Sequence, residues 1–346
     1  MRKRFFISIL RLAIFAVVTS IAVQASFADS DAYTNSVTSC LARAAAFAAI
    51  GNWDKMIAEC DEAIQLNPNA IDAYRGRGSA YYEKGDFNEV ISNYSEVIRL
   101  KPDDANAHSY RGYAYSKNGN LDMAIADYTE FLSLNSNKPA EYCSRAQLYG
   151  QKGEVDKAIS DYDEAIRLDP KNSNAYFGRA YEYGYKKDFD KVISDLSESI
   201  RLNPTNAQAY FYRGYACQIK GAFDKAADDY IKSSELDPNT SAVWDSLNSL
   251  AWQLATSPDI SIRNGKKSLE VAKRACEVTM WREWRYLDTL AAAYAETGDF
   301  DNAVKYQKMV VNMQGSLKIQ EQYGLTERLQ LYEQKEPYHE AAKHEP

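Results

Sequence analysis

Hydrophobic, small and polar residues recur along this chain with a fixed spacing of 34 residues. The first half of each repeat carries a large residue at position 4 and a small one at position 8, such as Tyr74 and Gly78. The second half shows the i, i+4, i+7 spacing of one apolar helix stripe, as in Ala158, Tyr162 and Ala165. Each repeat is therefore predicted to be a pair of helices. Six repeats follow one another without a gap, at 37–70, 71–104, 105–138, 139–172, 173–206 and 207–240.

Helix-ending residues keep the same period. Position 15 is glycine in five of the six repeats, where a helix end favours a left-handed residue, and Lys187 takes this place in the fifth. Position 30 is leucine in all six repeats, and a proline stops the helix two residues later in five of them. After residue 240 the period loosens into two less regular repeats over 241–317, followed by a polar capping helix near 316–335.

This pattern resembles the tetratricopeptide repeat (TPR) family, and the stretches "GDF" at Gly85–Phe87 and "AISDYDEAIRLDP" at Ala158–Pro170 match its motif closely. The resemblance implies an all-α fold, a right-handed α-solenoid of about eight helix-turn-helix repeats with a C-terminal capping helix. One repeat has too little apolar surface to fold alone, so neighbours bury one another's faces. The C-terminal block is similar to the end of bacterial exported TPR proteins.

The N-terminus has the organisation of a secretory signal. A basic segment, "MRKRFFISILR", precedes the apolar run "LAIFAVVTSIAV", and small residues allow cleavage after Ala25 or Ala28. We therefore expect residues 1–28 to be removed, residues 29–36 to form a short linker, and the mature protein to be periplasmic or secreted with no stable membrane span. The alternative is an uncleaved anchor, for which an apolar run of 12 residues is short.

Charge and motifs argue against several classes of function. The full chain has a formal net charge of −7, and loss of the signal's four basic residues brings the mature value to about −11, which disfavours nonspecific nucleic-acid binding. Residues 318–346 are predicted to be the capping helix and a polar tail, and in "HEAAKH" the spacing of His339 and His344 does not suit a zinc site, so both histidines are expected to be solvated. We predict no enzyme activity, cofactor or metal.

Two cysteines of the first repeat are candidates for a disulfide. Cys40 and Cys60 stand at positions 4 and 24, where the two antiparallel helices should face each other. In an oxidising compartment their bond would close a loop of about 20 residues and contribute roughly 3 kcal/mol. The alternative is a pair of small buried hydrophobic residues.

One face of the first helices is predicted to bind a partner. If positions 4, 7, 8 and 11 point toward the core, positions 2, 5, 6, 9, 12 and 13 lie on the opposite face. The resemblance implies that this face lines a concave groove for peptides, whereas the alternative is that the rings pack against neighbouring helices. The Lys, Asn and Arg residues of the family's carboxylate clamp have no counterpart here. The face carries ten aromatic candidates: Tyr82, Tyr110, Tyr113, Phe177, Tyr181, Tyr185, Phe211, Tyr212, Tyr215 and Trp252.

Arginine occupies position 7 in every regular repeat, and an acid occupies position 23 in five of the six. The simplest account is a structural ladder of Arg–acid pairs between packed helices, in which the arginine stem covers apolar surface. The six arginines are Arg43, Arg77, Arg111, Arg145, Arg179 and Arg213. The sequence as a whole predicts a non-enzymatic scaffold that binds a protein or an extended peptide. The alternative is a self-associating subunit of an envelope or secretion assembly, and light scattering would distinguish the two.

Overall fold

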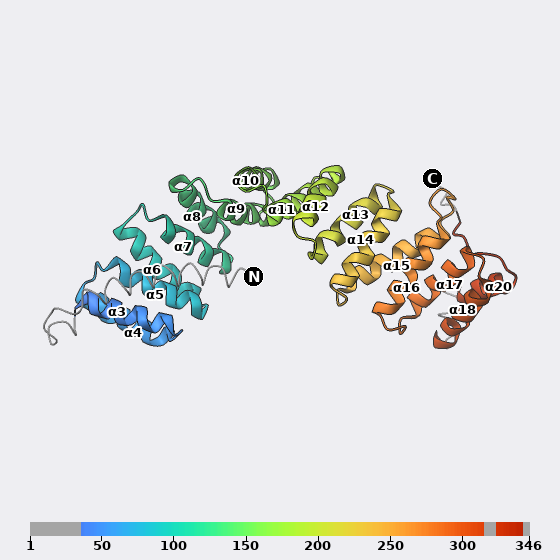
Figure 1. Cartoon of the computed structure of the whole chain (residues 1–346), viewed down its shortest axis with the longest axis horizontal. Coiled ribbons are helices and arrows are strands. Elements are labelled where there is room, and N and C mark those ends of the chain that lie inside the picture. Colours follow the sequence, from blue (N-terminus) through green and yellow to red (C-terminus); the bar gives the residue numbers. More distant parts are fainter. Residues whose placement is uncertain (1–35, 315–322, 342–346) are drawn as a thin grey trace. The chain divides into compact units, whose positions relative to one another are not determined.

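The computed structural model describes residues 36–314 and 323–341, and every regular element among them is a helix. The predicted signal peptide, most of the linker and His344 lie outside the described residues. The chain divides into two compact units, Met1–Pro170 and Lys171–Pro346, and the division falls close to the end of the fourth repeat. The predicted all-α solenoid is confirmed within each unit, because each helix packs against the next along the chain (Figure 1).

The N-terminal compact unit holds the first four repeats as helix pairs. Within each pair the two helices pack along their length, and the second helix of each of the first three pairs also packs on the first helix of the next repeat. The pairs are α3 (Val37–Ala49) with α4 (Trp53–Leu66), α5 (Ile71–Lys84) with α6 (Phe87–Leu100), α7 (Ala105–Lys117) with α8 (Leu121–Leu134), and α9 (Pro139–Gln151) with α10 (Val155–Leu168).

The C-terminal compact unit continues the same arrangement and ends in the capping helix α20, which packs on α18. One cluster of buried side chains extends from the sixth repeat through the two less regular repeats to α20, and it contains Leu247, Leu250 and Leu287. The helices are α11 (Ser173–Tyr185), α12 (Phe189–Leu202), α13 (Ala207–Ile219), α14 (Phe223–Leu236), α15 (Ser241–Thr256), α16 (Gly265–Val278), α17 (Trp284–Glu296), α18 (Phe300–Gln314) and α20 (Leu325–Glu333).

The small residue at position 8 lets the two helices of a repeat approach closely. A Cβ atom on Gly78 would lie 2.9 Å from the ring of Tyr94, and one on Gly214 would lie 3.0 Å from the ring of Tyr230. Both tyrosines stand at position 24 and are buried. The 34-residue alternation of small and large residues is therefore a packing requirement of the helix pair.

The predicted helix ends are confirmed by backbone geometry. Gly85 follows α5 with a φ of 79°, the left-handed conformation that glycine adopts without steric cost. Lys187 takes the equivalent place after α11 with a φ of 57°, so the turn persists where the glycine is missing. Among the described helices, none combines the length and the apolar character that crossing a bilayer requires.

Candidate protein-interaction surface

The structure brings the position-7 arginines to their position-23 partners. In four repeats the contact is bidentate, and three of these are Arg111 on Asp127, Arg145 on Asp161 and Arg213 on Asp229, with N–O distances of 2.7–2.9 Å. The aspartates are almost fully buried and the arginines are about one-fifth exposed. Arg179 pairs with Asp195 in the same way, and Arg43 contacts Glu59 at 2.8 Å.

Four of the ladder arginines, Arg77, Arg111, Arg145 and Arg213, also reach back to the preceding repeat, which the sequence did not predict. Nη1 of Arg111 donates to Ser95, and Nη1 of Arg145 donates to Thr129, both at 3.1 Å. The second repeat has Asn93 in place of the acid, and Arg77 there finds its carboxylate on Asp61 of the first repeat at 2.5 Å. The guanidinium thus joins three helices, two of its own repeat and one of the neighbour.

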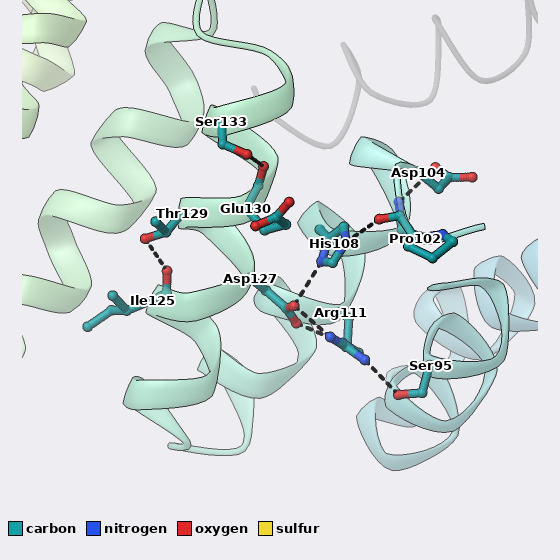
Figure 2. Close-up of polar contacts among 11 residues, drawn as sticks. Ser95, Pro102, Asp104, His108, Arg111, Ile125, Asp127, Thr129, Glu130 and Ser133 are labelled. Carbon is teal, nitrogen blue, oxygen red and sulfur yellow. Dashed lines mark hydrogen bonds and ion pairs between the residues drawn. The ribbon is translucent and has the colours of Figure 1, made fainter. Parts of the chain in front are cut away.

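His108 extends this network in the third repeat, where it replaces the tyrosine that stands at position 4 in four of the six regular repeats. Figure 2 shows its ring between two acceptors: Nδ1 lies 3.1 Å from Asp127 Oδ1, and Nε2 lies 3.0 Å from the carbonyl oxygen of Pro102. The Tyr74 hydroxyl donates to the equivalent carbonyl of Pro68 at 3.2 Å. The buried histidine therefore serves the same link between successive repeats.

We expect His108→Tyr to change the free energy of unfolding by less than about 1 kcal/mol, because a tyrosine can still reach the Pro102 carbonyl. His108→Leu should cost about 1–3 kcal/mol, since it leaves that acceptor without its donor. Denaturant unfolding of both variants measures the difference. Equal losses in the two would contradict the carbonyl contact as the reason for a polar side chain here.

The aromatic candidates of the N-terminal compact unit pack mainly on one another. Tyr110 stacks on Tyr94 with ring centroids 5.0 Å apart, and Tyr82 contacts the rings of Tyr110 and Tyr113 at 5.8 and 5.3 Å. Burial is the main cause that raises the pKa of the Tyr82 hydroxyl. These three rings are half-buried, so the packing alternative describes them better than an open binding surface.

Three of the six aromatic candidates of α11 and α13 are open to solvent, and the other three, Phe177, Phe211 and Tyr212, are half-buried. Tyr181, Tyr185 and Tyr215 are 47%, 62% and 51% exposed. Tyr181 has its ring 5.3 Å from Tyr185 and 6.0 Å from Tyr212, which links the two helices. We call the set Phe177, Tyr181, Tyr185, Phe211, Tyr212 and Tyr215 the aromatic face.

An open cleft of about 540 Å³ adjoins the aromatic face. Tyr215 and Ile219 line one side, and Asp245 and Gln253 of α15 line the other. Hydrogen bonds keep its floor polar: Gln218 accepts from the Tyr230 hydroxyl at 2.9 Å and donates to Gln253 at 3.3 Å. Tyr286 donates to the Asp245 carboxylate at 2.8 Å.

This region is nearly uncharged. Across the fifth, sixth and seventh repeats, positions 2, 5, 6, 9, 12 and 13 comprise 18 residues, and Asp245 is the only charged one. Aromatic rings, glutamine, serine and glycine make up most of the remainder. The surface therefore offers contact area and hydrogen bonds rather than charge.

A buried ion pair joins α20 to α17, and no periodic signal pointed to it. Arg328 makes two hydrogen bonds to Asp288 at 3.1 and 2.7 Å, and both side chains are less than a tenth exposed. Burial raises the pKa of the Asp288 carboxyl, and the charge of Arg328 opposes that shift. The guanidinium also lies 5.2 Å from the ring of Trp252, the last aromatic candidate. Trp252 thus belongs to the capping region and not to the aromatic face.

The structure also bears on the predictions for His339 and for the cysteines Cys40 and Cys60. The expectation that His339 is solvated is wrong: Nε2 lies 2.7 Å from Glu296, and the side chain is half-buried, because the chain folds back after α20. Cys40 and Cys60 are buried free thiols in this structure, so the disulfide is not formed here and stays a prediction. Burial raises the pKa of the Cys60 thiol to about 12, which disfavours its reactive thiolate.

Models of known protein families match four segments of the repeat region. Models described as tetratricopeptide repeat match residues 105–138, 139–172 and 179–239, and one described as TPR repeat matches residues 78–119. The first two matches coincide with the third and fourth repeats. The chain is a tetratricopeptide repeat protein. No curated protein matches this TPR chain.

The chain is similar to several solved structures. The C-terminal part of a TPR repeat-containing protein from Cytophaga hutchinsonii is 18% identical with a TM-score of 0.60, over 72% of this chain and 99% of that one. A TPR protein from Parabacteroides merdae is 16% identical with a TM-score of 0.49, over 76% and 98% of the two chains. YrrB, described as a TPR protein with an unusual peptide-binding site, is 21% identical with a TM-score of 0.47, over 56% and 95%. The first of these supports the α-solenoid.

Proposed function

We propose that this TPR protein is a non-enzymatic scaffold that binds an extended segment of a partner protein on the aromatic face. The observation that carries the proposal is the solvent exposure of Tyr181, Tyr185 and Tyr215. Clustered aromatic side chains exposed on a folded protein usually have a binding role. The family assignment supports a protein-interaction role, and the rest of the proposal depends on these side chains.

The chemistry of the face suits a main chain in extended conformation. Tyrosine rings give a large contact area with few rotors, and their hydroxyls keep hydrogen-bonding capacity. The cleft beside Tyr215 adds the amides of Gln218 and Gln253, which can pair with peptide N–H and C=O groups. Such a segment gains affinity from a few buried anchors in the centre of the contact.

The partner segment should carry little charge. Asp245 is the only charged residue among the 18 positions of this region, so neither an acidic nor a strongly basic segment finds matching groups. We expect apolar and aromatic side chains to occupy the spaces between the tyrosines. Affinity should therefore change less than about threefold between about 50 and about 500 mM salt, because screening acts on charge pairs that this face lacks.

The test places a photo-crosslinking amino acid at Tyr215 in the full-length protein and identifies the covalently captured partner from intact cells. The same amino acid at Tyr323, which is similarly exposed at 47%, controls for nonspecific capture. A peptide from the crosslinked segment is then titrated against purified protein at the two salt concentrations. This links a partner to the aromatic face and measures its charge dependence.

Replacing Tyr181, Tyr185 and Tyr215 together by alanine should weaken binding of that peptide at least about tenfold, because the change removes several anchors at once. The unfolding transition should change little, since all three side chains are exposed. Tyr323→Ala is the matched control and should bind like the wild type. Unchanged affinity in the triple variant would overturn the proposal.

The predicted export remains part of the proposed function. The signal-like residues 1–28 support a periplasmic or secreted location. N-terminal sequencing of the protein from cell fractions tests it, and an intact Met1 on a cytoplasmic protein would contradict it.

A further inference from the structure

The last described residues return to the body of the C-terminal compact unit. Lys335 follows α20 with a φ of 61°, and the Glu336 N–H closes the turn on the carbonyl of Leu331 at 2.9 Å. Pro337 then prevents the helix from resuming. Residues 336–341, which we call the C-terminal tail, have no regular secondary structure.

Tyr338 of the tail enters an aromatic and cationic site. Its ring lies 5.9 Å from the ring of Trp252, and the guanidinium of Arg328 lies 5.2 Å from each of the two rings. Asp288 holds the guanidinium of Arg328, so the position of this cation does not depend on the tail. A tyrosine in this position gains both ring contact and cation–π attraction.

The two residues after Tyr338 make polar contacts with the same region. His339 pairs with Glu296 at the end of α17, at 2.7 Å. Glu340 accepts a hydrogen bond from the Trp252 indole at 2.7 Å, and its backbone N–H donates to Thr256 at 2.8 Å. Thr256 is the last residue of α15, and the final carbonyls of a helix have no partner within that helix.

These contacts are of the kind that a bound extended peptide makes: an aromatic anchor, a main-chain hydrogen bond and a carboxylate two residues after the anchor. Trp252 stands at position 12 of the seventh repeat, one of the positions of the predicted binding face. We propose that the C-terminal tail is an intrachain ligand of a site formed by Trp252, Arg328, Glu296 and the Thr256 carbonyl. The site recognises an extended segment with tyrosine followed two residues later by glutamate.

The tail can leave this site without unfolding the cap. Leu325 and Tyr332 of α20 are fully buried, whereas Tyr338 is half-buried and Glu340 is exposed. The tail therefore contributes much less to the core than the helix before it. A released tail exposes Trp252 to any segment of the same chemistry, including one that extends from the aromatic face, and this last consequence rests on the proposed function.

The test uses the full-length protein and a fluorescent peptide with the sequence of residues 334–346, "QKEPYHEAAKHEP". In the wild type the attached tail competes at the high effective concentration of a tethered ligand. The double variant Tyr338→Ala/Glu340→Ala should bind the peptide at least about tenfold more tightly than the wild type. Glu336→Ala alters an exposed tail residue outside the site and should bind like the wild type.

Adding Trp252→Ala to the double variant should abolish binding of the peptide. Hydrogen exchange should show protection of the Glu340 amide in the wild type and its loss in Tyr338→Ala. Equal peptide affinity in the wild type and the double variant, or binding that survives Trp252→Ala, would overturn the inference.

Failure of this inference can be separated from failure of the proposed function. Peptide binding to the double variant should be unaffected by Tyr181→Ala/Tyr215→Ala, because those residues lie outside the tail site. A peptide that fails to bind while the crosslinked partner still depends on Tyr215 disproves only the tail site. If the peptide binds through Trp252 but partner binding is unchanged when Tyr181, Tyr185 and Tyr215 are replaced, only the aromatic-face proposal is disproved.

Discussion

Arg328→Ala should lower the free energy of unfolding of the C-terminal compact unit by about 3–5 kcal/mol, because it leaves a buried charge without its partner. Asp288 is almost fully buried, and Arg328 makes two hydrogen bonds to it. Removing the guanidinium leaves the Asp288 carboxylate buried without an ion-pair partner. The same change removes the cation that contacts the rings of both Trp252 and Tyr338.

Hydrogen exchange followed by mass spectrometry is the measurement, because it reports the stability of α17 and α20 separately from the N-terminal repeats. The control is the double variant Asp288→Leu/Arg328→Met, which removes both charges and keeps apolar volume. We expect it to recover most of the loss, as replacements of whole buried ion pairs often do. A single variant that costs less than about 1 kcal/mol would show that the pair is solvated in solution.

Arg145→Ala is the second large effect. It should lower the free energy of unfolding by about 3 kcal/mol, at the lower end for a buried pair, because Arg145 is still 15% exposed. The change also leaves Thr129 without its donor across the repeat boundary. Binding at the aromatic face should be unchanged, because Arg145 lies on α9 and the face lies on α11 and α13.

Arg167 provides a matched control within the same repeat. It makes two hydrogen bonds to Glu164, at 2.8 and 2.6 Å, but its side chain is 66% exposed. Arg167→Ala should therefore cost less than about 0.5 kcal/mol. Denaturant unfolding of the two variants isolates the effect of burial on otherwise similar pairs. Equal losses of unfolding free energy in the two variants would contradict the structural role of the ladder. If Arg145→Ala lost partner binding at unchanged stability, Arg145 would have a role in binding instead.

The periodic part of the fold was predictable because one physical constraint acts at every repeat. The small residue at position 8 must fit against the residue at position 24, which is tyrosine or leucine in five of the six regular repeats, so the pattern recurs and is visible in one sequence. The pairing of Arg145 with Asp161 followed from the same period. Its contact with Thr129 did not, because a small polar residue on a helix surface carries no distinctive signal.

The site could be predicted only in part, since the exposure of a ring depends on its neighbours. Tyr113 and Tyr215 occupy the same position of their repeats, yet Tyr113 packs against Tyr82 and Tyr215 borders an open cleft. The Arg328–Asp288 pair spans 40 residues outside the regular period. The tail contacts involve residues that resemble an ordinary polar terminus until the turn at Lys335 directs them back.

The hydrogen bonds from ladder arginines to the preceding repeat have a consequence for the number of repeats in such arrays. Arg145 reaches the hydroxyl of Thr129, and Arg111 reaches the hydroxyl of Ser95, each in the repeat before its own. Excising residues 105–138 as one cassette would present Ser95 to Arg145 in place of Thr129. The junction chemistry is interchangeable, so a gene can gain or lose a whole repeat without leaving a guanidinium unmatched.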